Sequence, residues 1–449
     1  MAKIKRDNVV EFLRERCTAI GVLVGAALVS LSLGPYSNFD TEVEFAAASS
    51  VVTQGLPFSS PGNLVNQPPF GFYLNGFFLR TFGLSYATGV AAVTMWGVGC
   101  VFLVYQVGKT FYNARTGLVA AGVFALLPWE AVLARSFLID VPCLFFSLLS
   151  LLVGVWAVRK ASLKVTLVSG ILFGFAFLTK FFAIFTLIPL ALILVRYPPK
   201  SLRLWAAQVG IFAFPVLFMY YLWYELISRL GVFSFFGHND FSSFTQGVTP
   251  SSYFLLRFFA DNPGTLLLLS VGISIFLVTW TRKDFRASFF DLVCLVTIVG
   301  TAGVNMFLVL SLGLLVPYVD PVKYDYQALP AFCLLAASLL EKARLLQPLQ
   351  GEHSRRSKLP FLASLIGIVL LAGSIAASGL TLSGLVSKDN VMFKVEGDIA
   401  FSFQNVGLIP DLSLQYTLLA LGFFTVVVCI VCGLRTKSRP ARSDLEGRL

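Results

Sequence analysis

Three carboxylates stand within five residues of one another, directly after the first apolar run of the chain. They are Asp40, Glu42 and Glu44. An ionisable group beside lipid is costly to place, so it suggests a functional site by default. A positioned carboxylate can accept the proton of a hydroxyl nucleophile, and this acidic stretch therefore predicts general-base chemistry. The alternative is a solvated acidic turn in an interfacial loop.

The residues that follow predict a helix over 41–54 that lies along the membrane interface. On such a helix Asp40 and Glu44 are four residues apart and share a face, whereas Glu42 points elsewhere. Further along, the Pro68-Pro69 pair predicts an extended turn before Phe70. The sequence thus places two of the three acids together.

The composition is that of an integral membrane protein. Of 449 residues, 57% are hydrophobic and 13% are charged, whereas soluble domains carry about 25% charge. No polar stretch is long enough to bury a core of its own, so no soluble domain is expected. The net charge of +11 is therefore interpreted by its location along the chain. It does not indicate nucleic-acid binding, and membrane lipids are the expected surroundings.

Apolar runs of about 18 or more residues mark membrane spans, and shorter runs are inferred from the charges between them. The predicted fold is all-α and polytopic, with about twelve spans and with interfacial helices in the first outer loop. They lie near 17–35, 86–107, 116–134, 141–158, 165–179, 181–197, 204–223, 264–281, 289–312, 327–341, 360–386 and 415–434. We expect a catalytic membrane module over 1–341, followed by C-terminal helices, an outer loop and a tail over 342–449.

The basic residues orient these spans. When the N-terminus is placed in the cytoplasm, 26 of the 34 Lys and Arg residues fall in the tails and in the loops of the cytoplasmic side. Cytoplasmic loops of membrane proteins are enriched in Lys and Arg. We therefore predict a multi-pass protein of the cell membrane with both termini in the cytoplasm. The acidic stretch then lies on the extracytoplasmic side, where the active site is expected.

Two basic residues on that side could bind an anion. Arg135 and Asp140 stand in the predicted turn between the third and fourth spans, where they pair with each other or serve different partners. Lys180 stands alone between apolar runs, so its ammonium group either extends to the lipid headgroups or binds an anion. Only Thr179 and Lys180 separate the fifth span from the sixth.

A third group on the outer side is Lys323, Tyr324 and Tyr326, whose tyrosines could instead belong to an aromatic belt. Cations on three outer turns and carboxylates on a fourth suit a phosphate-bearing lipid donor and a hydroxyl acceptor. Bound cations would stabilise the departing phosphate. No metal ligand set is predicted, because the chain has only two histidines. A divalent cation is left open as a cofactor.

The order of the motifs resembles the polyprenyl-phosphate-sugar-dependent glycosyltransferases of the GT-C class. Protein O-mannosyltransferases and lipid A aminoarabinose transferases are the most similar families. The resemblance covers about 1–200 well and thins toward 340. It rests on the acidic stretch at 40–42, NQPPFGFY at 66–73, LRTFGLS at 79–85, RSFLIDVP at 135–142, GFAFLTK at 174–180 and VKYDY at 322–326.

This resemblance implies a membrane glycosyltransferase with an extracytoplasmic site and an inverting displacement. It assigns the role of base to Asp40, and phosphate binding to Lys180, Arg135 and Lys323. The family pattern has Glu directly after Asp, whereas Thr41 intervenes here. The second acidic role is thus open between Glu42 and Glu44.

The predicted substrate-binding residues are Arg135, Asp140, Lys180, Lys323, Tyr324 and Tyr326. The predicted partners are a polyprenyl-phosphate sugar and an acceptor that is a glycan, a lipid or a protein. A transporter or lipid flippase is the main alternative, and it would place ionisable groups at the membrane midplane within inverted repeats. A non-catalytic scaffold is a third, and it would tolerate substitutions at Asp40 and Lys180.

Overall fold

The chain was analysed as a computed structural model. The residues that it describes are 16–30, 39–60, 62–65, 67–127, 130, 133–199, 201–229, 288–312, 326–342, 420–422 and 424–429. The expected spans at 264–281 and 360–386, as well as Lys323 and Tyr324, lie outside them. The predicted number of twelve spans therefore stays a prediction.

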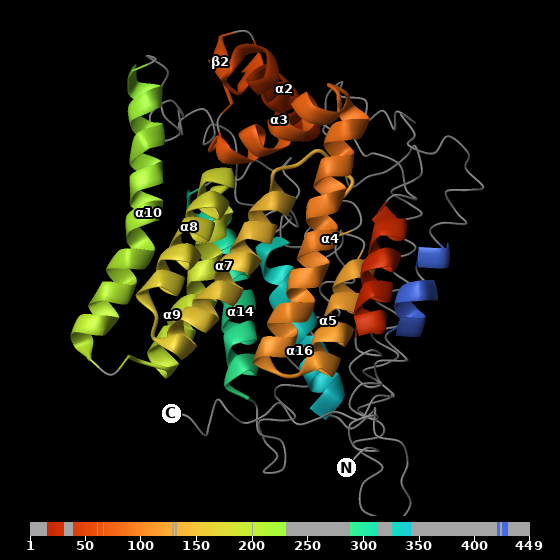
Figure 1. Cartoon of the computed structure of the whole chain (residues 1–449), viewed down its shortest axis with the longest axis vertical. Helices are drawn as coiled ribbons and strands as arrows, with labels where there is room; N and C mark the ends of the chain where they lie inside the picture. Colours follow the sequence, from red (N-terminus) through yellow and green to blue (C-terminus); the bar gives the residue numbers. More distant parts are fainter. Residues whose placement is uncertain are drawn as a thin grey trace, which may run out of the picture.

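The described part of the chain is a helical bundle with a small cap of outer-loop elements above one end (Figure 1). The cap consists of α2 (Phe39–Gln54), β1 (Phe58–Ser60), β2 (Asn63–Leu64) and α3 (Phe70–Phe82). The bundle consists of α4 (Tyr86–Phe111), α5 (Ala114–Leu126), α7 (Asp140–Lys160), α8 (Leu163–Thr179), η1 (Phe181–Thr186), α9 (Leu187–Arg196), α10 (Leu202–Arg229), α14 (Phe289–Leu312), η2 (Tyr326–Ala328) and α16 (Leu329–Lys342). The all-α prediction is confirmed, with β1 and β2 as a minor antiparallel addition.

Three helices in the described part of the chain are long and apolar enough to cross a membrane. They are α4, α7 and the Leu202–Leu226 part of α10. The interior of the bundle is built around α7, whose apolar window is 78% buried, whereas only 17% of the window in α10 is buried. Because lipid is as apolar as leucine, the exposed face of α10 is compatible with contact to acyl chains.

Two span boundaries are informative. The predicted break at Lys180 is confirmed, since α8 ends at Thr179 and Lys180 adopts an extended backbone before η1 begins. The predicted third span, 116–134, was too long, because α5 ends at Leu126 and Leu127 is extended. Leu127 precedes a proline in the sequence, and a residue before proline is disfavoured in the helical conformation. The residues between Leu127 and α7 therefore form a connection that does not continue α5.

The cap contains the interfacial helices predicted for the first outer loop and adds the short strands β1 and β2. The helix predicted over 41–54 is present as α2, and a second helix, α3, begins directly after Pro68-Pro69. The hydroxyl of Tyr73 in α3 donates to the carbonyl of Gly55 at 2.8 Å. Gly76 allows close approach, because a Cβ there would lie 3.2 Å from the carbonyl oxygen of Ala48 in α2. The two helices therefore pack together as one cap.

The first and last helices of the described chain also meet. Residues 16–30 and 420–429 are drawn side by side in red and blue (Figure 1). A Cβ on Gly422 would lie 2.8 Å from the carbonyl oxygen of Gly25, so these two helices approach through small residues. The predicted division of the chain at 341/342 stays a prediction.

Candidate active site

The three acids of the first loop occupy different environments on α2. Asp40 is half-buried, Glu42 is exposed and Glu44 is buried. This pattern agrees with the predicted helical geometry, in which positions four apart share a face. The shared face of Asp40 and Glu44 lies toward the bundle, and Glu42 points away from it.

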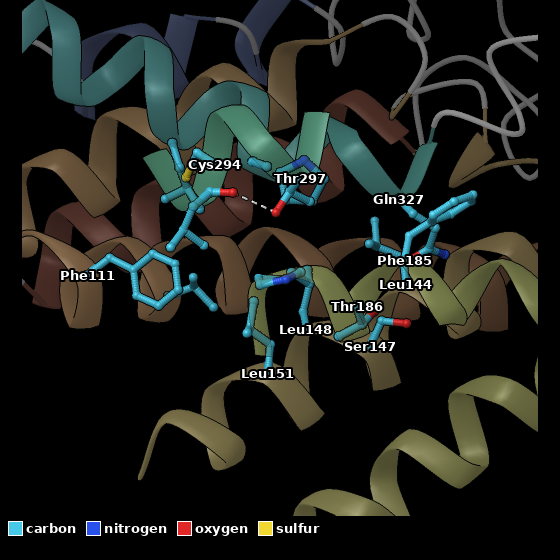
Figure 2. Close-up of a pocket in the computed structure, with 16 residues that line it drawn as sticks. Phe111, Leu144, Ser147, Leu148, Leu151, Phe185, Thr186, Cys294, Thr297 and Gln327 are labelled. Carbon is cyan, nitrogen blue, oxygen red and sulfur yellow. Dashed lines mark hydrogen bonds between the residues drawn. The ribbon is translucent and has the colours of Figure 1, made fainter. Parts of the chain in front are cut away.

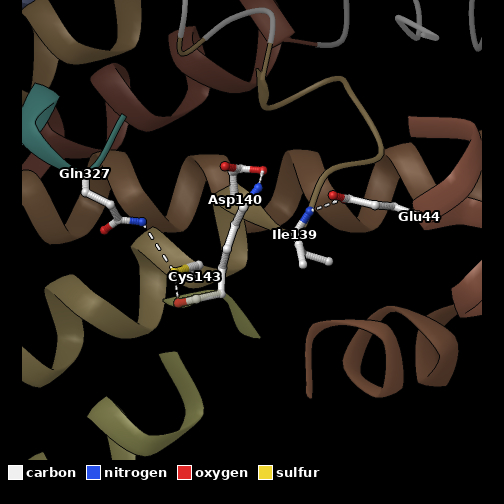
Figure 3. A network of polar contacts seen from close by, with 6 residues as sticks. Glu44, Ile139, Asp140, Cys143 and Gln327 are labelled. Carbon is white, nitrogen blue, oxygen red and sulfur yellow. Dashed lines mark hydrogen bonds and ion pairs between the residues drawn. The ribbon is translucent and has the colours of Figure 1, made fainter. Parts of the chain in front are cut away.

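Glu44 connects the cap to the bundle. Its Oε2 accepts a hydrogen bond of 2.7 Å from the backbone N–H of Ile139, the residue before the first residue of α7 (Figure 3). The first N–H groups of a helix have no partner within the helix, and the helix dipole favours a negative charge there. Glu44 therefore holds α2 against the beginning of α7, although 95 residues separate Glu44 and Ile139 in the sequence.

A buried ion pair lies at the same place. Asp140 is the first residue of α7, and Lys180 follows the last residue of α8. The Nζ of Lys180 lies 2.7 Å from Oδ2 of Asp140, and the two side chains are 4% and 3% exposed. Lys180 therefore does not extend to the surface, and the partner of Asp140 is Lys180 and not Arg135. A buried ion pair keeps both members charged only when they remain together.

A polar contact links this pair to the beginning of α16. The Sγ of Cys143 donates to the carbonyl oxygen of Lys180 at 3.6 Å and accepts a bond of 3.4 Å from Nε2 of Gln327 (Figure 3). Cys143 stands one turn after Asp140 on α7. The contact therefore brings η2, which contains Gln327, against the ion pair.

The next residue toward the N-terminus, Tyr326, is fixed by an acid that we did not predict to belong to the site. The hydroxyl of Tyr326 donates to Oε2 of Glu130 at 2.5 Å, and both side chains are almost fully buried. Glu130 lies in the connection between α5 and α7, and burial raises the pKa of its carboxyl group to about 8, against the opposing effect of the bond from Tyr326. Its other oxygen, Oε1, has no hydrogen-bond partner in the described structure.

Of the predicted residues, the structure places Glu44, Asp140, Lys180 and Tyr326 around the beginning of α7. Arg135 is 1% exposed in the connection that leads into α7, and Asp140, Lys180 and Tyr326 follow as described above. Glu130 and Gln327 were missed. A signal for Glu130 was its position as the only acid in an apolar run next to Arg135. Gln327 carried no such signal.

An apolar pocket begins beside Gln327 and runs along α7 (Figure 2). Its α7 wall is formed by Leu144, Ser147, Leu148 and Leu151, and its volume is about 40 Å³. A cavity of roughly 150 Å³ is needed to hold benzene. The pocket as it stands is too small for an isoprene unit, and it does not identify the binding site of a lipid chain.

No metal site is apparent in the described residues. They contain no group of three or more His, Cys, Asp or Glu side chains that could hold a metal ion. His238, which was not predicted to be a ligand, lies outside these residues.

The fold agrees with comparisons to known proteins. The model of the family described as dolichyl-phosphate-mannose-protein mannosyltransferase matches residues 66–224. This stretch contains α3, the connection with Arg135, and the ion pair of Asp140 and Lys180. A crystal structure of ArnT from Cupriavidus metallidurans bound to undecaprenyl phosphate is similar in fold, with a TM-score of 0.53 and 15% identity, over 93% of this chain and 76% of that chain. The apo state of the same protein gives a TM-score of 0.52 and 16% identity over the same shares.

A curated relative is YycA of Bacillus subtilis (strain 168), whose name proposes a mannosyltransferase. It is 30% identical over 125 residues, which are 28% of this chain and 18% of YycA. The match thus spans under a fifth of that relative. The predicted resemblance to the GT-C class is confirmed by the family match and by the fold.

Proposed function

We propose that this protein is an integral-membrane glycosyltransferase that moves a sugar from a polyprenyl phosphate to a hydroxyl acceptor on the extracytoplasmic side. The observation that carries the proposal is the hydrogen bond between Glu44 and the N–H of Ile139. This bond places the acidic face of α2 at the beginning of α7, beside the buried pair of Asp140 and Lys180. Acid and cation thereby serve one site although they are distant in sequence.

Asp40 is the proposed base. The acceptor oxygen attacks the anomeric carbon of the donor sugar as the bond between that carbon and the phosphate oxygen breaks. The polyprenyl phosphate leaves with the electron pair, and the acceptor proton passes to the carboxylate of Asp40. Such assistance contributes about 10²–10⁴-fold to a rate. Asp40 is half-buried on α2, within the outer-loop cap where the proposed acceptor would arrive.

Lys180 is the proposed phosphate ligand. An ammonium group has three N–H donors, and the bond to Asp140 uses one of them. The other two can stabilise the negative charge that develops on the departing phosphate. Arg135 is buried in the neighbouring connection and is proposed to contribute a second positive charge, as is Lys323. Tyr324 remains a predicted substrate contact outside the described residues.

Glu44 takes the second acidic role in this proposal, as a positioning residue that acts through the N-terminus of α7. Its carboxylate is buried and bonded to the backbone, whereas Glu42 is exposed on another face of α2. Tyr326 likewise positions η2 through Glu130. The donor lipid is proposed from the matching family, described as dolichyl-phosphate-mannose-protein mannosyltransferase, and from the similar fold of ArnT, whose structure holds undecaprenyl phosphate. A glycan, a lipid and a protein are all candidate acceptors.

The test is transfer from a radiolabelled polyprenyl-phosphate sugar by the purified full chain in liposomes. Asp40→Asn keeps the size of the side chain and removes its basicity, so the transfer rate should fall by about 10²-fold or more. Glu225→Gln is the matched control, because Glu225 forms a partly exposed pair with Arg229 on α10. Transfer by Asp40→Asn at the wild-type rate would eliminate the proposed base. Lipid movement without transfer by the wild type would favour the flippase alternative.

A further inference from the structure

Asn75 of α3 carries a buried side-chain amide whose hydrogen-bonding groups are not used within the described fold. The side chain is 0% exposed, and neither Oδ1 nor Nδ2 has a hydrogen-bond partner in the part of the chain that the structure describes. A primary amide offers two N–H donors and an acceptor oxygen. Buried polar groups in native proteins are nearly always hydrogen-bonded, so an exception requires a reason. An apolar side chain of similar size would fill this position at a lower energetic cost.

The helical positions of its neighbours show where Asn75 lies. Gly71, Asn75 and Leu79 are spaced by four residues in α3, so they form one stripe on the helix. All three are buried. A Cβ on Gly71 would lie 2.8 Å from side-chain carbons of both Ile139 and Thr179. This end of the stripe therefore rests on the beginning of α7 and the end of α8.

The other end of the stripe lies near the connection that leads into α7. A Cβ on Gly89 would lie 2.4 Å from the ring of Phe137 and 3.6 Å from Cδ2 of Leu79, so Leu79 lies near Phe137. Asn75 is between these two contacts. Ile139 and Thr179 are the residues directly before Asp140 and Lys180, whose side chains form the ion pair. The unused amide therefore lies on the face of the cap that covers the proposed phosphate site.

We propose that the amide of Asn75 binds hydroxyl groups of the donor sugar. The proposal deepens the function proposed above and rests on it. Nδ2 would donate to one hydroxyl oxygen of the sugar, and Oδ1 would accept from a neighbouring hydroxyl. A site that hydrogen-bonds a hydroxyl discriminates strongly, because its buried groups are left unpaired when the hydroxyl is absent. Asn75 is then a residue that determines which sugar the enzyme accepts.

The chain provides a matched control in Gln208 of α10. Its side chain is 3% exposed, and both of its amide atoms also lack a partner within the described residues. Gly170, on α8, would contact Phe212 of α10 through a Cβ, and Gln208 stands one turn before Phe212. Gln208 is thus close to the beginning of α8, whereas the ion pair is at its end. The two amides share the same chemistry and differ in location.

The experiment measures binding by thermal shift and by displacement, with purified full-length protein in detergent. The probes are undecaprenyl phosphate and the same lipid carrying mannose, glucose or arabinose. For the sugar-bearing lipid that the wild type prefers over the bare lipid, Asn75→Leu should weaken binding at least tenfold. The affinity for bare undecaprenyl phosphate should stay within twofold of wild type. Gln208→Met should change neither affinity. Neither variant should lower the melting temperature, because each removes a buried amide that has no partner.

Asn75→Ala provides a second, smaller substitution and should show the same selective loss. The proposal is overturned if both Asn75 variants keep the wild-type preference for the sugar-bearing lipid. It is also overturned if the affinity for the bare lipid falls as much as the affinity for the sugar-bearing lipid, because an equal loss indicates a structural role. A wild type that binds no sugar-bearing lipid more tightly than the bare one also overturns it. A wild type that binds neither kind of lipid contradicts the proposed function itself, and this outcome is distinct from the others.

Discussion

The two ends of the bundle both bury carboxylates, but the carboxylates at the two ends differ in their hydrogen-bond partners. At the end where α4 and α16 finish and α14 begins, Asp291 accepts through Oδ1 from the hydroxyls of Tyr112 at 3.1 Å and Ser338 at 2.7 Å. Its Oδ2 accepts from the N–H of Ser288 at 2.7 Å. Glu341 nearby accepts from Nδ2 of Asn113 through both of its oxygens. Each carboxylate oxygen of this network has a donor.

The end where α7 begins is different. Asp140 pairs with an ammonium group, Oε1 of Glu130 has no partner within the described chain, and the amide of Asn75 has none there either. A fully satisfied polar network stabilises a fold, whereas an incompletely satisfied one is costly. We propose from this comparison that the carboxylates at the α14 end are satisfied within the fold, whereas the α7 end retains polar atoms for a ligand. The following variants test this division.

The largest effect is expected at the ion pair. Lys180→Met should destabilise the protein by about 3–5 kcal/mol, because it leaves Asp140 buried without a countercharge. Unfolding by heat or denaturant in detergent measures this loss. Adding Asp140→Asn should restore most of the stability and none of the transfer activity. A double variant as unstable as the single one would show that the charge of Asp140 is not the cause.

At the other end, Asp291→Ala should cost about 3 kcal/mol, since two hydroxyls and one backbone N–H lose their acceptor. The transfer rate per folded molecule should stay at the wild-type value. The measurement combines unfolding with an assay normalised to folded protein. A fall in the normalised rate would mean that the two ends are coupled, contrary to the proposed division.

A matched pair of tyrosine variants separates stability from function. Tyr326→Phe and Tyr112→Phe each remove one buried hydroxyl that donates to a carboxylate, so each should cost about 1.5–3 kcal/mol. Only Tyr326→Phe should lower the transfer rate, because Tyr326 fixes the segment that contacts Cys143. The hydroxyl of Tyr112 also contacts Sγ of Cys294 at 3.7 Å. The rate of N-ethylmaleimide labelling, followed peptide by peptide, should therefore rise at Cys143 in Tyr326→Phe and at Cys294 in Tyr112→Phe. Equal loss of transfer in both variants would contradict the assignment of Tyr326 as a positioning residue.

The smallest effects are expected on α2. Glu44→Gln keeps an acceptor for the N–H of Ile139 but loses the charge at the helix N-terminus, which should cost about 0.3–1 kcal/mol. Its transfer rate should fall severalfold as the cap shifts. Glu42→Gln should change stability by less than about 0.5 kcal/mol, as is usual for an exposed position. If Glu42→Gln lowers transfer more than Glu44→Gln does, the second acidic role belongs to Glu42.

Much of the helical framework could be predicted because hydropathy acts locally. The runs at 86–107, 141–158 and 204–223 correspond to α4, α7 and α10, and the polar break at Lys180 separates two helices as expected. Hydropathy predicted the ends of helices less well where a proline or a contact within the cap determines them. For that reason the sequence did not predict that α5 ends before Pro128 or that a helix of the first outer loop begins directly after Pro69.

By itself, the sequence determined that the protein is a helical membrane protein, that Asp40 and Glu44 share a helix face, and that acids and cations gather in particular connections. These properties depend on residues that are near one another along the chain. Only the tertiary structure decided the partners: Asp140 with Lys180 across 40 residues, Glu44 with Ile139 across 95, and Glu130 with Tyr326 across 196. A buried charge takes whichever partner the packing of helices brings within reach, and no local pattern records that choice.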